Sequence, residues 1–94
     1  MRTIYKYELP RQVESTVQLP QGAEVLSVQL QLYGQFFLWA LVDDSAPPEP
    51  RTFRIIGTGQ PVEDGLIHIT TIQESFADKD QGIFVWHVFE RPAS

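Results

Sequence analysis

The sequence predicts an all-β fold, a small antiparallel sandwich or partly open barrel of about six or seven strands with at most one short helical turn. Three observations lead to this prediction. Short segments of β-type alternation recur at roughly regular spacing along the 94 residues. No amphipathic stretch is long enough for a useful helix. The continuous apolar run Phe36–Val42 is bounded by turn residues, as a buried central strand would be. We expect a single domain, residues 1–94.

Turn residues separate the expected strands, because proline cannot donate to a β-ladder and glycine readily adopts positive φ. Residues 43–50 contain three prolines and three acids, so they are expected to form an extended surface loop. The helical turn is expected at Ser75–Asp78. The seven expected strands are residues 2–9, 13–19, 24–33, 36–42, 52–56, 66–73 and 82–90.

The clearest alternation, in residues 24–33, predicts a hairpin with the run Phe36–Val42. Gly34 and Gln35 suit a two-residue type II′ turn with glycine first. That turn would place Leu32 opposite Phe37, and a slip of one residue would bring glutamines into the core layer. The same register places Leu30 opposite Trp39 and Val28 opposite Leu41. The predicted core is Leu26, Val28, Leu30, Phe37, Trp39, Leu41, Phe53, Ile55, Ile67, Ile69, Phe84, Trp86 and Val88.

Composition excludes several classes of function. There is no cysteine, so a disulfide framework, a thiolate metal site and a cysteine nucleophile are all excluded. The net charge of −5 and the scattered basic residues argue against direct binding of nucleic acid, whose recognition depends on neutralising phosphates. No apolar segment is long enough to span a membrane, and no signal peptide is apparent. We expect a cytoplasmic protein without a cofactor or a metal.

The two histidines, His68 and His87, are the strongest candidates for chemistry. If their strands form a hairpin, His68 lies opposite Phe89 and His87 opposite Thr70, which makes the two imidazoles diagonal neighbours on one face. Such a pair suits metal-free acid–base catalysis, although the sequence places no lysine or arginine nearby to stabilise an oxyanion. A metal would need a third ligand. A purely structural role is the alternative.

A second candidate site is the glycine-rich turn Gly57-Thr58-Gly59-Gln60, which precedes Pro61. Backbone N–H groups in such a turn can converge on a small anion. Anion sites of this kind normally open a helix, whereas here Pro61 and then Glu63 follow, so no helix begins and the local charge is unfavourable. A plain turn or bulge is the alternative.

The order of several short blocks resembles a family of small uncharacterised domains encoded by bacteriophages, prophages and some bacteria. Members of that family often carry histidine at the position of Gln60, so the resemblance implies acid–base chemistry in this turn less strongly for the present chain. His87 matches the family pattern. The blocks are LPQGA (residues 19–23), LSVQ (26–29), LWALVD (38–43), IGTGQP (56–61) and FVWHVFE (84–90).

These observations support three expectations for function. The first is a phage-type accessory protein, in the host cytoplasm, that binds a host or phage protein and in its sharpest form inhibits a host defence system. The second is a metal-free hydrolase that uses His68 and His87. The third is a self-assembling module that holds a small anionic ligand at the glycine-rich turn, with dimers formed through the unpaired edge at residues 2–8.

Overall fold

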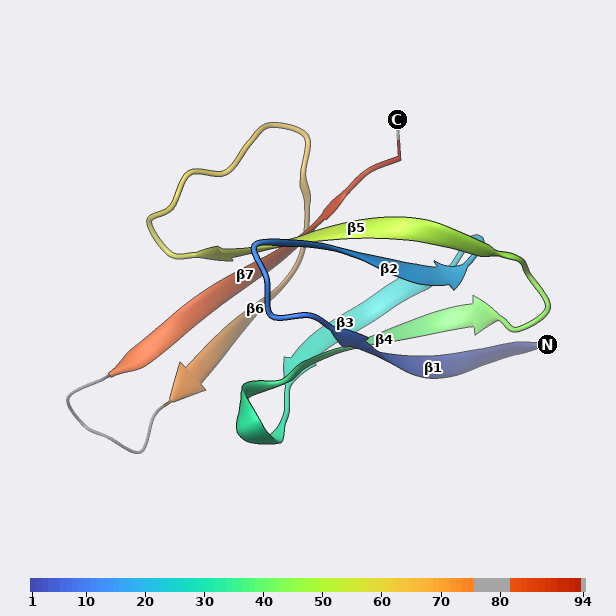
Figure 1. The fold of residues 1–94 in the computed structure, drawn as a ribbon, viewed down its shortest axis with the longest axis horizontal. Coiled ribbons are helices and arrows are strands. Elements are labelled where there is room, and N and C mark those ends of the chain that lie inside the picture. The colour runs from blue at the N-terminus through green and yellow to red at the C-terminus, as the bar shows by residue number, and fades with distance from the viewer. Residues whose placement is uncertain (76–81, 94) are drawn as a thin grey trace.

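The structure, a computed structural model, describes residues 1–75 and 82–93, which form seven β-strands and one short 3₁₀ turn (Figure 1). The strands form two antiparallel sheets that do not close into a barrel, so the predicted all-β sandwich is confirmed. The elements are β1 (Arg2–Leu9), β2 (Glu14–Pro20), β3 (Glu24–Leu30), the 3₁₀ turn (Leu32–Gly34), β4 (Phe36–Asp43), β5 (Pro48–Gly57), β6 (Ile67–Ser75) and β7 (Ile83–Arg91).

The chain crosses between the two sheets after β1, after β2 and after β4, and its last three strands stay in one sheet. The three-stranded sheet has the order β1-β4-β3 and the four-stranded sheet the order β2-β5-β7-β6. β3 packs on β6 and β1 lies next to β2, so the sheets face each other and share one hydrophobic core. Every strand therefore has one face toward this core and one face away from it, here called the outer face of its sheet.

The core is built from alternate residues of both sheets. Of the predicted core, Val28, Phe53, Ile55 and Val88 are buried, which confirms them. Leu30, Ile69 and Trp86 are partly buried against the core. Outside β4, three predicted members are wrong, because Leu26, Ile67 and Phe84 are 46%, 56% and 44% exposed. The full cluster is Leu9, Leu19, Ala23, Val28, Phe36, Leu38, Ala40, Val42, Phe53, Ile55, Ile72 and Val88.

The β3–β4 hairpin exists, but its predicted register is wrong. Leu30 pairs with Phe36 and Val28 with Leu38, three positions away from the expected pairing. The connection is not a two-residue turn: residues 31–35 form a wider loop in which Tyr33 and Gly34 have φ of 64° and 71°. A hydrogen bond of 2.8 Å from the Gln31 N–H to the Gln35 carbonyl closes it. The loop takes up residues that the prediction had assigned to the ladder.

An odd shift of register turns β4 over. Phe36, Leu38, Ala40 and Val42 are no more than 1% exposed, so this set faces the core. The predicted core residues Phe37, Trp39 and Leu41 are instead on the outer face, half-buried. The run is apolar on both faces, so its own pattern did not define which face turns inward. In β3, Gln29 lies on the outer face as predicted. A bulge between Val25 and Ser27 moves Leu26 out of the core, where it is exposed.

The predicted loop at residues 43–50 is shorter than expected, because β5 begins at Pro48. Pro48 pairs with Pro20 and Pro50 with Gln18 of β2. The pairing of β5 with β7 begins only at Thr52, so β5 has a neighbour on one side alone where its prolines lie. Proline is tolerated there because a strand edge needs no donor. The predicted helical turn at Ser75–Asp78 lies almost wholly outside the described residues; Ser75 itself ends β6.

Candidate functional site

His68 and His87 lie on the same outer face of the four-stranded sheet, where Thr71 bridges them. The Thr71 Oγ1 is 3.0 Å from His68 Nε2 and 3.0 Å from His87 Nδ1. His68 pairs with Phe89, and its ring meets the Phe89 ring edge to face with centroids 5.3 Å apart. The expected juxtaposition of the two strands therefore places both imidazoles within reach of one hydroxyl.

The residue opposite His87 is Thr71, whereas the sequence predicted Thr70. A bulge between His68 and Thr70 adds one residue to β6, so the pairing moves by one position past Ile69. Without this bulge Thr71 would face the core and Thr70 would lie opposite His87, so the bulge determines which of the two threonines bridges the imidazoles.

The glycine-rich turn contacts the same histidine. Thr58 Oγ1 lies 2.8 Å from His87 Nε2, so the two candidate sites of the sequence form one connected group. Much of the turn's own hydrogen bonding is internal. The Gln60 N–H donates to the Gly57 carbonyl over 3.1 Å, and the Gly57 N–H donates to Gln60 Oε1 over 3.2 Å. Anion binding by this turn stays a prediction.

The four side chains form a continuous hydrogen-bond chain, His68–Thr71–His87–Thr58. Two arrangements of hydrogens satisfy it, because each hydroxyl can accept from one neighbour and donate to the other. In one arrangement the Thr58 hydroxyl donates to His87 Nε2 while His87 Nδ1–H donates to Thr71. That order of hydroxyl, base and orienting group is the one that nucleophilic catalysis uses.

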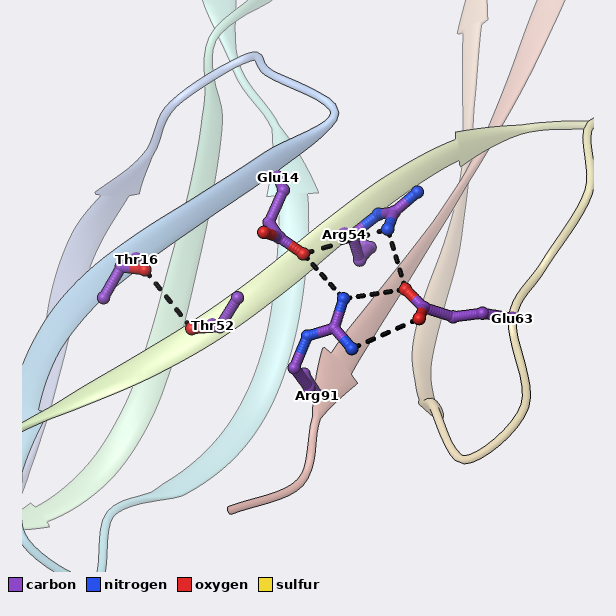
Figure 2. Close-up of polar contacts among 6 residues, drawn as sticks. All are labelled: Glu14, Thr16, Thr52, Arg54, Glu63 and Arg91. Carbon is purple, nitrogen blue, oxygen red and sulfur yellow. Dashed lines mark hydrogen bonds and ion pairs between the residues drawn. The ribbon is translucent and has the colours of Figure 1, made fainter. Parts of the chain in front are cut away.

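An ion-pair network lies on the same outer face as these four side chains, because Arg54, Phe89 and His68 form one row across β5, β7 and β6. Figure 2 shows the network, which holds the segment after the glycine-rich turn. Glu63 Oε1 accepts from Arg54 over 2.7 Å and from Arg91 over 2.7 Å. Glu14 Oε1 accepts from Arg91 over 2.7 Å and lies 3.8 Å from Arg54. Glu63 therefore joins the β5–β6 connection to Arg54 of β5 and Arg91 of β7, and the same two arginines pair with Glu14 of β2.

The network balances its own charge. Hydrogen bonding from Arg91 and the nearby positive charges hold the pKa of Glu63 below its ordinary value. Arg54 pairs with Phe89 on β7, and Phe89 pairs with His68 on β6, so a cation lies in the same row as a candidate histidine. The sequence had indicated no arginine near the histidines. Both arginines are nevertheless engaged by carboxylates, which limits what they offer to a substrate.

A second polar cluster, formed around Glu74 and Arg11, connects several elements at one end of the sandwich. Glu74 is only 6% exposed and accepts from Arg11 at both carboxylate oxygens, over 2.6 and 3.0 Å, and from Trp86 Nε1 over 3.0 Å. The Arg11 guanidinium lies over the rings of Phe36 and Trp86 and donates to the Gly34 carbonyl. Hydrogen bonds from Arg11, and a smaller one from Trp86, lower the pKa of Glu74 despite burial.

A groove of about 250 Å³ opens beside this cluster. Arg11, Trp86 and Gln60 of the glycine-rich turn are among its lining residues. Glu74 already neutralises the Arg11 charge, so the groove is mainly apolar in character. The cluster is best explained as structural, because it joins the β1–β2 connection to β6, β7 and the loop before β4.

The outer face of the three-stranded sheet carries a stripe of apolar side chains. Phe37, Trp39 and Leu41 of β4 form it, together with Ile4 of β1, which pairs with Leu41 and is 55% exposed. Lys6 crosses the stripe with its Nζ 4.1 Å from the centroid of the Phe37 ring and 2.8 Å from Gln31 Oε1. Arg2, Glu8, Glu24 and Asp43 lie around the stripe as a charged rim.

Sequence reasoning missed Thr71, the Thr58–His87 contact and the network of Glu14, Arg54, Glu63 and Arg91. The hairpin alternation could have placed Thr71 beside the histidines only if the bulge had been recognised. The ion pairs join residues up to 77 positions apart, and no local sequence pattern predicts them. Within residues 1–75 and 82–93, no group of three histidine, aspartate or glutamate side chains is arranged to hold a metal, and no helix is long and apolar enough to cross a membrane.

The fold is a small antiparallel β-sandwich whose described residues include a histidine–threonine hydrogen-bond chain, an ion-pair network, the Arg11–Glu74 cluster and an apolar outer face. The chain belongs to the family described as a domain of unknown function, DUF7352, which it matches over residues 1–94. No curated protein and no solved structure matches the chain.

Proposed function

We propose that the domain acts by binding another protein through the outer face of its three-stranded sheet. The observation that carries this proposal is the orientation of β4. Its even-numbered residues fill the core, while Phe37, Trp39 and Leu41 point to the outer face, where Ile4 is largely exposed. A strand that is apolar on both faces usually has a layer on each. Here a partner supplies the second layer.

The chemistry of the face fits a protein partner. Aromatic and aliphatic side chains occupy its centre, where Lys6 lies over the Phe37 ring, and the other charged or amide side chains lie at its rim. An apolar centre with a polar rim is the usual arrangement of protein interfaces. The net charge of −5 is unfavourable for nucleic acid. We therefore take the partner to be a protein with a flat apolar surface that packs on Trp39 and Phe37.

The resemblance to phage-encoded domains supports a host protein as the partner. A phage-type accessory protein of this size acts by occupying a surface of a host complex, and inhibition of a host defence system is the sharpest form of the proposal. The acidic character of the chain would aid its association with a basic surface at the rim of such a complex.

The test compares affinity capture by three tagged forms of the domain from a bacterial lysate. The F37S/W39S variant removes the centre of the apolar stripe. The V62S variant removes an exposed apolar side chain, 47% accessible, from the β5–β6 connection, and serves as the matched control. A captured protein is identified, purified and titrated against all three forms by calorimetry.

The proposal requires a purified partner that binds the wild type and V62S with equal affinity and binds F37S/W39S at least tenfold more weakly. Capture of no specific protein overturns it. So does a partner that binds all three forms alike.

A second candidate function, a metal-free hydrolase, is favoured by the contact of Thr58 with His87. In that role the Thr58 hydroxyl would attack, His87 would accept its proton, Thr71 would hold the imidazole, and His68 would complete the acid–base pair. The test is turnover of aryl esters and of an aryl phosphodiester by the wild type and by H68A/H87A. Turnover that disappears in a folded H68A/H87A supports the hydrolase; no turnover, or turnover that survives the substitutions, rejects it.

A further inference from the structure

The free edge of β1 differs from the other sheet edges of the described chain. β3 and β6, which are also edge strands, each contain a bulge, and β2 ends in Pro20. Bulges and prolines are common devices that prevent a sheet edge from pairing with another chain. β1 instead pairs with β4 through all eight of its residues without a shift of register. In Figure 1 it lies at the lower right, next to β4, with no strand on its other side.

The pairing with β4 determines which backbone groups of β1 face the free edge. The Asp44 N–H donates to the Met1 carbonyl over 3.1 Å, so Met1 and Asp44 form a hydrogen-bonded pair of the antiparallel ladder. Such pairs alternate with non-bonded pairs. Odd-numbered residues of β1 therefore direct their N–H and C=O groups to β4. The even-numbered residues Arg2, Ile4, Lys6 and Glu8 direct theirs outward.

Two side chains near the ends of this edge carry unmatched charge. Arg2 and Glu8 form no ion pair within the described residues. All other arginines of the chain, Arg11, Arg51, Arg54 and Arg91, lie in ion pairs. Arg2 and Glu8 are placed symmetrically about Tyr5, each three positions away from it along β1. An antiparallel copy of β1 centred on Tyr5 therefore brings each charge against its opposite.

We propose that two copies of this chain pair through β1 in antiparallel fashion, with a two-fold axis at Tyr5. Arg2 then lies opposite Glu8 of the partner subunit, and Ile4 lies opposite Lys6 of the partner subunit. Every outward N–H and C=O group of Arg2, Ile4, Lys6 and Glu8 gains a partner in the new ladder. The exposed Ile4 side chain packs against the aliphatic stem of the partner's Lys6.

Charge selects this register over its neighbours. Side chains that lie opposite each other must share a face, so the pairing can slip only by steps that keep even residues opposite even residues. A slip in one direction places Lys6 opposite Lys6 of the partner subunit. A slip in the other places Arg2 opposite Lys6 of the partner subunit. Like charges directly opposite each other destabilise a sheet.

The dimer would form a continuous six-stranded sheet from the two three-stranded sheets. One outer face measures about 27 by 14 Å, or roughly 400 Å², from the length of eight residues and the width of three strands. The usual protein interface buries about 800 Å² per partner. The paired outer faces reach that size together. The dimer does not rest on the proposed function, however, since it is formed by the strand edge and not by the apolar stripe.

The test is sedimentation equilibrium of the full chain with charge-reversal variants. R2E and E8R each place like charges opposite each other at both ends of the interface, so each should raise the dimer dissociation constant by about tenfold. An equimolar mixture of R2E and E8R should recover a heterodimer, because every opposed pair is then of opposite sign. E24R reverses an exposed acid on β3 and should leave the dimer unchanged; F37S/W39S should leave it unchanged as well.

A cross-linking experiment fixes the register. The chain has no cysteine, so Y5C introduces a single thiol at the proposed axis. Opposed non-bonded residues have Cα atoms about 4.5 Å apart, within the range of a disulfide. Y5C should therefore form a covalent dimer on oxidation, whereas T3C, whose two copies would lie about 14 Å apart, should not. A wild type that stays monomeric at about 1 mM, a dimer indifferent to R2E and E8R, or cross-linking of T3C in place of Y5C would each overturn the proposal.

Discussion

Lys6 of β1 lies directly opposite Trp39 of β4 and reaches across the strand to place its ammonium 4.1 Å from the centroid of the Phe37 ring. The contact lies on the outer face of the three-stranded sheet, so it covers part of an apolar stripe with a solvated cation. Cation–π contacts at exposed sites contribute about 0.5–1 kcal/mol. The aromatic side chains of the stripe are thus held in place without being removed from water.

The orientation of β4 leads to the first prediction. Leu38 is fully buried and Leu41 is half-buried on the outer face. L38A should lower the free energy of unfolding by about 2–5 kcal/mol, because it leaves a cavity in the core. L41A should lower it by about 1 kcal/mol, because it removes only partial burial. Urea denaturation measures both. A larger loss for L41A than for L38A would mean that β4 faces the other way.

The Arg11–Glu74 pair leads to a pH prediction. The folded-state pKa of Glu74 lies below its ordinary value of 4.5, mainly because Arg11 donates to it. The resulting stabilisation is present above the unfolded pKa and is lost as the pH falls through the folded-state pKa. Urea denaturation from pH 7 to pH 3 should show this loss in the wild type, and E74Q should weaken the dependence on pH in that range.

R11M tests the same pair from the cationic side. It leaves the Glu74 carboxylate buried with only Trp86 as a donor, and should lower the free energy of unfolding at pH 7 by about 3 kcal/mol. E74Q keeps an oxygen acceptor for Trp86, so its free energy of unfolding should fall by less than that of R11M. If R11M and E74Q are equally stable at pH 7, the buried charge is not what makes Arg11 necessary.

The Glu63 network should restrain the β5–β6 connection. E63Q removes the charge that Arg54 and Arg91 share, so amide hydrogens of residues 58–66 should exchange faster while those of β4 do not change. D64N, which alters a neighbouring acid, is the control. Equal exchange in E63Q and the wild type would show that the connection is held by other contacts.

Tyr33 offers a stabilising substitution. It is 98% exposed and has a φ of 64°, a left-handed conformation that costs most residues about 1 kcal/mol. Y33G should therefore raise the free energy of unfolding by up to about 1 kcal/mol. G34A is the contrasting variant, because Gly34 also has positive φ and an added Cβ would lie 3.2 Å from Arg11 Nη1. A destabilised Y33G would indicate that the loop adopts another conformation in solution.

The sandwich and most strand positions could be predicted from alternation and turn residues, since both are local signals. The orientation of β4 could not, because Phe36–Val42 is apolar at every position and either face would fill a core. The length of the loop at residues 31–35 sets the register of β4 and therefore which of its faces turns to the core. The strand that pairs with β1 and β3 inherits its register from that loop, not from its own pattern.

The candidate site was predictable only in part. Each histidine lies on a recognisable strand, and the pairing of His68 with Phe89 follows from the loop length. The link through Thr71 depends on a single-residue bulge, which the alternation of residues 66–73 does not reveal. The contact of Thr58 with His87 joins the turn after β5 to β7 and depends on strand order, which no local segment encodes.

The central claim is that the domain binds a protein with the outer face of its three-stranded sheet. Its most direct test is amide chemical-shift mapping of the isotope-labelled domain during titration with the purified partner. The account predicts shifts that centre on Phe37, Trp39 and Leu41 of β4 and leave His68 and His87 unchanged. Shifts centred on the two histidines, with β4 unchanged, would contradict it and would place the functional surface on the four-stranded sheet.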